Sequence, residues 1–228
     1  MIRIFSDFLN LIYPNVCNIC DEKLVLGEKQ FCAGCLTDFP KTGINDLKDN
    51  PVARIFWGRV NISGAYSLFY FIKGSKYQTL LHKIKYKGEK ELGIAMGRMI
   101  GTELFKLMTG HIDYIVPVPL HKRRLRARGY NQSELIAKGI AEAMKLEILS
   151  DGLIRQIFNP SQTKRGRIER WENVEGIFRA NHCEKLRDKH ILLVDDVITT
   201  GATFEACITA LNNDSNCKIS VASLAYTK

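Results

Sequence analysis

A short apolar run followed by two acids constrains the fold of this chain more than any other feature. Ile191–Val194 is four consecutive apolar residues, the pattern of a strand buried on both faces within a parallel sheet. Asp195 and Asp196 come next, and apolar residues then recur at helical spacing over 204–211. The sequence therefore predicts a strand, a turn and a helix, with both acids at the carboxyl end of the strand.

The turn between this strand and helix is small and rich in hydroxyl groups; it contains Thr199, Thr200, Gly201 and Thr203. A turn that opens a helix presents unpaired backbone N–H groups and the positive end of the helix dipole, so an anion binds there favourably. The two acids would accept hydrogen bonds from sugar hydroxyls or hold a cation. This combination indicates a ribose 5-phosphate site, and it matches neither a Walker A loop nor a G-x-G-x-x-G fingerprint.

The stretch Ile191–Thr203 resembles the 5-phosphoribosyl-1-pyrophosphate (PRPP) signature of the type I phosphoribosyltransferases, from the apolar positions through both acids to Thr-Thr-Gly-x-Thr. The resemblance implies that Asp195 and Asp196 contact the ribose hydroxyls. It also implies that the 5-phosphate is bound by Val197, Ile198, Thr199, Thr200, Gly201, Ala202 and Thr203. The alternative is a generic strand, turn and helix with an acidic surface turn.

A second apolar run, over 112–118, predicts another buried strand, which stops at Pro117 and Pro119. A cationic loop follows, with candidate pyrophosphate contacts at Lys122, Arg123, Arg124 and Arg128. A helix is predicted beyond it, over 135–143. Ligands of open parallel sheets bind beyond the carboxyl ends of the strands, so this loop and the acidic turn are expected to face one site.

The positive charge of the chain is concentrated. The net charge is +9, and thirteen cations gather in three clusters, over 83–90, 122–128 and 164–170, which contain only two glutamates. Such clusters are typical of a site for a polyanion, either a pyrophosphate-bearing ligand or a nucleic acid backbone. For the lysine cluster at 83–90, a solvated surface is an equally good interpretation.

Four cysteines near the start of the chain have the spacing of a zinc site. They form two Cys-x-x-Cys pairs separated by eleven residues: Cys17, Cys20, Cys32 and Cys35. Two such knuckles close a tetrahedral Zn²⁺ site, and the metal would supply the folding energy of so short a segment. One alternative is a pair of disulfides, which the expected reducing compartment disfavours, and the other is a vestigial or metal-free knuckle.

The chain divides into three predicted parts. Residues 1–40 form an amphipathic N-terminal helix over Met1–Tyr13 and the zinc knuckle, 41–55 a linker, and 56–228 the main domain. We expect α/β architecture for that domain: an open, mainly parallel sheet flanked by helices, with a short strand over 154–158 and a polar loop over Asn159–Asn173. No apolar run reaches membrane-spanning length and no secretory signal is recognised, so a cytoplasmic protein without membrane insertion is expected.

Nearly the whole sequence is similar to the ComF/GntX family of competence-associated proteins. The shared motifs are Lys85-Tyr-Lys-Gly88, Val116-Pro-Val-Pro-Leu120 with Arg-x-Arg-Gly-Tyr-Asn-Gln132, a loop containing Gln162, Arg170, Asn173 and Phe178, and the PRPP signature. Arg165 and Arg167 depart from the more neutral loop expected of the family.

The resemblance implies a phosphoribosyltransferase that acts on PRPP with Mg²⁺ and an unknown acceptor. Asp195 and Asp196 would fix the ribose, while Arg123, Arg124, Arg128 and the metal would offset charge on the leaving pyrophosphate. Two alternatives stay open. One is a PRPP-binding relative without turnover, and the other is a competence accessory that contacts single-stranded DNA or a helicase.

Overall fold

The computed structural model describes residues 14–108, 110–156 and 177–227, and its centre is a parallel sheet. Five strands lie in the order β1-β7-β6-β2-β3, and every neighbouring pair is parallel. Their bounds are β1 Gly64–Tyr70, β2 Tyr114–Pro117, β3 Glu147–Ile148, β6 His190–Ile198 and β7 Lys218–Tyr226. The predicted open parallel sheet is therefore confirmed.

Strand β6 lies in the middle of the sheet because both of its faces are apolar. Leu192 and Val194 face one core cluster, while Ile191 and Leu193 face the other. The strand is longer than its apolar run, because its pairing with β7 continues through Asp195 to Ile198. Both acids therefore lie inside the strand, near its carboxyl end, and not beyond it.

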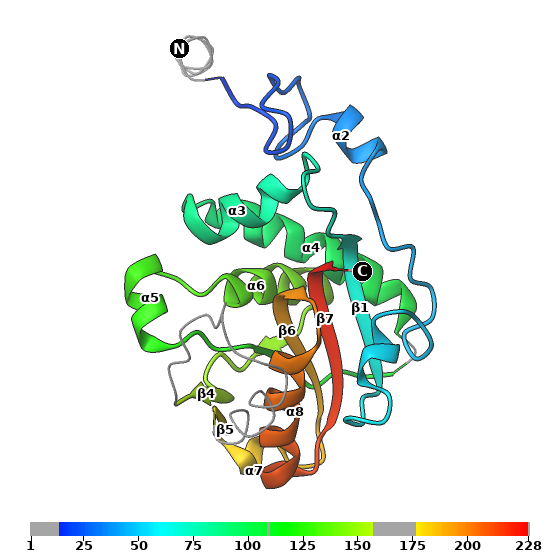
Figure 1. Ribbon diagram of the computed structural model, residues 1–228, viewed down its shortest axis with the longest axis vertical. Helices are drawn as coiled ribbons and strands as arrows, with labels where there is room; N and C mark the ends of the chain where they lie inside the picture. Colours follow the sequence, from blue (N-terminus) through cyan, green and yellow to red (C-terminus); the bar gives the residue numbers. More distant parts are fainter. Residues whose placement is uncertain (1–13, 109, 157–176, 228) are drawn as a thin grey trace.

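Helices cover both faces of the sheet (Figure 1). One layer, which shares a core cluster with Leu192 and Val194, contains α3 Gln78–Tyr86, α4 Lys90–Leu107 and α6 Gln132–Met144. The opposite layer contains the 3₁₀ helix η1 Ala53–Phe56, α7 Cys183–Leu186 and α8 Ala202–Ser215. A two-stranded antiparallel sheet, β4 Leu153–Arg155 and β5 Phe178–Ala180, adjoins this second layer.

Strand β4 replaces the strand predicted over 154–158, whose last two residues lie outside the described part of the chain. The predicted helix over Met1–Tyr13 and the loop over Asn159–Asn173 also lie outside it. Within the described residues, no helix is both long enough and apolar enough to cross a membrane.

Helices α4 and α6 touch backbone to backbone. A Cβ atom on Gly97 would lie 2.1 Å from the carbonyl oxygen of Ile136, and one on Gly139 would lie 2.0 Å from that of Ile94. Glycine at both positions lets the helix axes approach closely. This contact fixes α6, whose first turn reaches the acids of β6.

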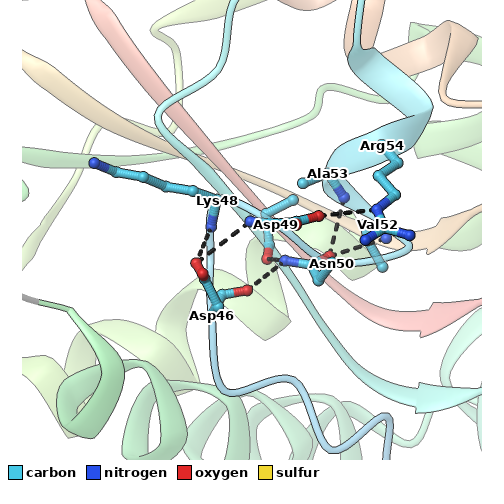
Figure 2. Close-up of polar contacts among 8 residues, drawn as sticks. Asp46, Lys48, Asp49, Asn50, Val52, Ala53 and Arg54 are labelled. Atoms are coloured by element: carbon cyan, nitrogen blue, oxygen red, sulfur yellow. Dashed lines mark hydrogen bonds and ion pairs between the residues drawn. The ribbon is translucent and has the colours of Figure 1, made fainter.

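The segment over 41–55, for which a linker was predicted, lies along β1 and has a buried asparagine at its centre (Figure 2). The Asn50 amide donates to the carbonyls of Asp46 (2.8 Å) and Ala65 (3.0 Å). Its side-chain oxygen accepts from the backbone N–H groups of Val52 (2.9 Å) and Ala53 (3.0 Å). These four bonds anchor the start of η1, which packs beneath the turn after β6.

The cysteine-rich segment packs on α3, and its short helix is α2 Ala33–Thr37 (Figure 1). Cys17 and Cys35 belong to the same apolar cluster as Leu80 and Ile84 of α3. The Tyr77 hydroxyl donates to the carbonyl of Cys35 at 3.2 Å. One continuous core therefore joins the knuckle to the helical layer.

The α4–α6 contact yields a stability prediction. Gly97→Ala should lower the free energy of unfolding by about 1 to 3 kcal/mol, the usual cost of overpacking, despite the higher helix propensity of alanine. Urea denaturation measures this change. Gly110→Ala is the control, because its Cβ meets nothing within 4 Å; equal stability of the two variants would contradict the backbone contact.

Candidate functional site

Asp195 is held by the first turn of α6. Its Oδ1 atom accepts from the Ser133 hydroxyl at 2.7 Å and from the backbone N–H of Asp196 at 2.9 Å. Asn131 caps α6: its side-chain oxygen accepts from the N–H of Ser133, and its amide donates to the carbonyl of Val118 at 3.0 Å. Asn131 and Ser133 thus connect the end of β2 to the acids of β6.

Asp196 is 5% exposed and faces a lysine of α3, which lies in the same helical layer as α6. The Nζ atom of Lys85, near the end of α3, lies 3.0 Å from Oδ2 of Asp196. Lys85 belongs to the lysine cluster at 83–90, for which the sequence allowed either a binding site or a solvated surface. In the structure, its ammonium group lies beside the acids.

The environment of Asp195 alters the ionisation of its carboxyl group. Burial, together with the Asp196 charge, raises the pKa of Asp195 to about 7, against the opposing effect of the Ser133 hydrogen bond. Asp195 is therefore poised between its neutral and ionised forms near neutral pH. In either form its oxygens remain able to hydrogen-bond a sugar hydroxyl.

The turn after β6 joins the acids to the N-terminus of α8. Gly201 has φ of 78°, and a Cβ there would lie 2.7 Å from Ile55 Cγ2, so η1 and this turn require glycine. Among the described residues, no side chain caps the start of α8. Of the predicted phosphate-binding residues, Val197 and Ile198 belong to β6, whereas four are exposed around this helix end: Thr199, Thr200, Ala202 and Thr203.

Arg59 clamps this turn, a contact that sequence reasoning missed. Its Nη1 atom donates to the carbonyl of Thr200 at 2.7 Å, and its Nη2 atom pairs with Glu205. Arg59 thereby joins the turn to the first helical turn of α8. A single arginine 141 positions away carries no local signal for this role.

The predicted cationic loop contains a helix, α5 Lys122–Arg128. His121 caps its start by accepting from the N–H of Arg123, and Gly129, with φ of 78°, ends it. Sequence reasoning assigned a loop because the cations masked these two capping signals.

Helix α5 and α3 form the walls of a cavity of about 770 Å³. Its lining comprises Lys85, Tyr86, Gly88, Arg124, Ala127, Arg128 and Tyr130. Arg128 bonds the side-chain oxygen of Gln132 and lies 5.3 Å from the centre of the Tyr86 ring. Of the four cations predicted to contact pyrophosphate, Arg124 and Arg128 line this cavity, whereas Lys122 and Arg123 are exposed on α5 outside its lining.

Arg155 is a second residue that the sequence did not reveal. Its Nε atom is buried and has no hydrogen-bond partner within the described residues, while its guanidinium lies 5.2 Å from the centre of the Phe178 ring. Burial and the charge of Arg124 lower the pKa of Arg155, and the Asp195 charge opposes them. A partly buried guanidinium within the fields of Arg124 and Asp195 adds to the positive potential around the acids.

The four cysteines of the knuckle converge, with all Sγ atoms within 4.8 Å of one another. The Sγ atoms of Cys20 and Cys32, one from each pair, are 3.7 Å apart, and all four thiols are free. A tetrahedron with Zn–S bonds of about 2.3 Å has edges of about 3.8 Å. Backbone N–H groups of Cys32 and Cys35 donate to sulfur at 3.3 and 3.4 Å. This donor set fits a tetrahedral metal ion.

Comparisons with known proteins agree with this geometry. Residues 132–228 match the phosphoribosyl transferase domain, a range that includes α6, β6, the acids and the turn. The DNA utilization protein YhgH of Escherichia coli K12 is 27% identical over 210 residues, covering 85% of this chain and 88% of that protein. Competence protein F of Haemophilus influenzae is 24% identical over 208 residues, covering 82% and 86%.

The chain is a homologue of these competence and DNA utilization proteins. Its fold is that of a type I phosphoribosyltransferase with an N-terminal four-cysteine knuckle. Among solved structures, a glutamine PRPP amidotransferase from B. subtilis, complexed with ADP and GMP, aligns with a TM-score of 0.40 and 21% identity, covering 57% of this chain and 26% of that one.

The raised pKa of Asp195 predicts that the stability of this protein depends on pH. Between its usual pKa of 3.8 and about 7, folded Asp195 keeps a proton that the unfolded chain has lost, so its contribution to stability falls as the pH rises. Asp195→Asn lacks this effect. As the pH rises from 4 to 8, the free energy of unfolding of the variant, measured by urea denaturation, should therefore increase relative to that of the wild type. Parallel pH profiles of the two proteins would contradict the raised pKa of Asp195.

Proposed function

We propose that this protein binds PRPP and that, as a phosphoribosyltransferase, it transfers or releases the phosphoribosyl group. The observation that carries the proposal is the arrangement at the end of β6, where two acids precede a glycine turn that opens α8 without a side-chain cap. Ribose hydroxyls suit the acids, and the 5-phosphate suits the free amide groups of α8.

The pyrophosphate would lie along α5. Arg124 and Arg128 line a cavity together with Lys85, the partner of Asp196, and a cationic wall favours a leaving group that gains negative charge. Lys122 and Arg123 of the same helix would add to the field that attracts the ligand. Mg²⁺ bound to the pyrophosphate would supply further charge neutralisation. The chain's own residues fix the ribose and phosphate and orient C1 towards the acceptor.

The names of the relatives support a role in the handling of DNA. The DNA utilization protein and competence protein F each align over most of their length with this chain. We propose that the protein takes part in DNA uptake, with a phosphoribosyl acceptor still to be found. Its partners there would be single-stranded DNA or a helicase, and it would act in the cytoplasm.

The proposal is tested by calorimetric titration of PRPP with Mg²⁺. An Asp195→Asn/Asp196→Asn double variant should bind at least about tenfold more weakly, because it loses charge-assisted hydrogen bonds to the ribose. Glu142→Gln removes an exposed carboxylate of α6 that pairs with Arg98 and serves as the control.

Absence of PRPP binding by the wild-type protein would refute the proposal. Where binding is found, a screen for pyrophosphate release over nucleobases, nucleotides and single-stranded DNA separates turnover from simple binding. Pyrophosphate release that depends on one acceptor class would identify the substrate.

We also propose that the four cysteines bind one structural Zn²⁺. Elemental analysis of the purified protein should find one zinc per chain. Cys20→Ser should lose the metal and lower the thermal unfolding temperature, because metal binding stabilises a segment too short to form a core alone. Cys183→Ser, outside the cluster, is the control; a metal-free wild-type protein would refute the zinc site.

A further inference from the structure

The acidic pair is a poor divalent-metal site as the chain presents it. Oδ1 of Asp195 accepts two hydrogen bonds, and Oδ2 of Asp196 faces the ammonium of Lys85 at 3.0 Å. Across the described residues, the only group of three or more metal-ligating side chains is the cysteine cluster. The position that a cation would take beside Asp196 is filled by a side chain of the protein.

The placement of Lys85 is built into α3. Successive helical residues are about 100° apart, so two lysines separated by one residue project to nearly opposite sides of a helix. Lys83 pairs with Asp21 of the knuckle at 2.9 Å, and Lys85 pairs with Asp196. The Tyr130 hydroxyl donates to the carbonyl of Ile84, between them, at 2.6 Å. The bond from Tyr130 holds the last turn of α3, whereas the pair at Lys83 involves a largely exposed carboxylate.

The electrostatic need for a cation here is clear. Two neighbouring carboxylates would repel both each other and an incoming phosphate. The Lys85 side chain is 25% exposed and lines the cavity, so it neutralises Asp196 from the side of the cavity. An ammonium has three N–H donors, and its pairing with Asp196 leaves donors for a ligand oxygen.

We infer that Lys85 is the resident cation of the acidic pair and positions it for the ribose, so that a sugar phosphate binds here without a divalent metal. The inference rests on the proposed PRPP site and deepens it. Mg²⁺ would then be required only by the pyrophosphate, which carries the metal in with it. Ribose 5-phosphate lacks the pyrophosphate and therefore reports on Lys85 and the acids alone.

The test is calorimetric titration of ribose 5-phosphate into the full-length protein, in buffer with Mg²⁺ and in buffer freed of Mg²⁺ by resin. A soluble chelator is avoided, because it would also strip a metal from the cysteines. Wild-type affinity should change by less than about twofold, while Lys85→Met should bind about tenfold or more weakly without Mg²⁺. Added Mg²⁺ should restore part of that loss, and Lys85→Arg should retain Mg²⁺-independent binding.

Lys83→Met is the matched control, since it removes a lysine from the same helix and breaks only the pair with Asp21. It should bind ribose 5-phosphate like the wild type. Circular dichroism and thermal unfolding establish whether each variant is folded. Lys85→Gln is a second neutral variant, to be used if Lys85→Met does not fold.

The outcomes separate this inference from the proposed function. If the wild type binds PRPP with Mg²⁺ but needs Mg²⁺ for ribose 5-phosphate, Lys85 is not the resident cation and the PRPP site stands. Unchanged binding in both neutral variants would overturn the inference in the same way. If the wild type binds neither ligand under any condition, the proposed function fails and the inference fails with it.

Discussion

The rest of the structure depends on the burial of β6 between two apolar layers. Alternate side chains from Ile191 to Val194 face opposite cores, and the strand pairs with β7 on one side and β2 on the other. Burial on both faces excludes water from the strand, so the first polar side chains at its end need partners in the helices that pack on it. Ser133 of α6 and Lys85 of α3 are those partners. The chemistry of the site follows from the position of this strand.

The sequence predicted the parts of the fold that repeat a local pattern. The apolar runs at 112–118 and Ile191–Val194 located β2 and β6, and the Cys-x-x-Cys spacing located the knuckle. The end of β6 was placed four residues early, because strand pairing is decided by the partner strand and not by hydrophobicity. Asp195 and Val197 pair with Ser223 and Ala225 of β7, and the local pattern of β6 does not identify that partner.

The contacts that shape the site were harder to predict, because they join distant residues of ordinary local character. Arg59 reaches Thr200, and Arg155 lies in a three-residue strand beside Phe178. Asn50 occupies a polar, turn-rich stretch that has the composition of a linker, yet it is buried and makes four hydrogen bonds. Composition alone cannot distinguish an exposed asparagine from one that satisfies buried backbone groups.

The position of α3 links two features that the sequence presented as separate. Its apolar side packs on the knuckle through Leu80 and Ile84, while Lys85 and Tyr86 at its end form part of the cavity wall. A helix held at one side by the knuckle can place an ammonium beside Asp196 only if the knuckle keeps its shape. The four cysteines lie far from the acids in the sequence, but both groups contact α3: the knuckle packs on its apolar side, and Asp196 pairs with Lys85. The folding of the knuckle is in this way a structural condition for the electrostatics of the site, whichever acceptor it serves.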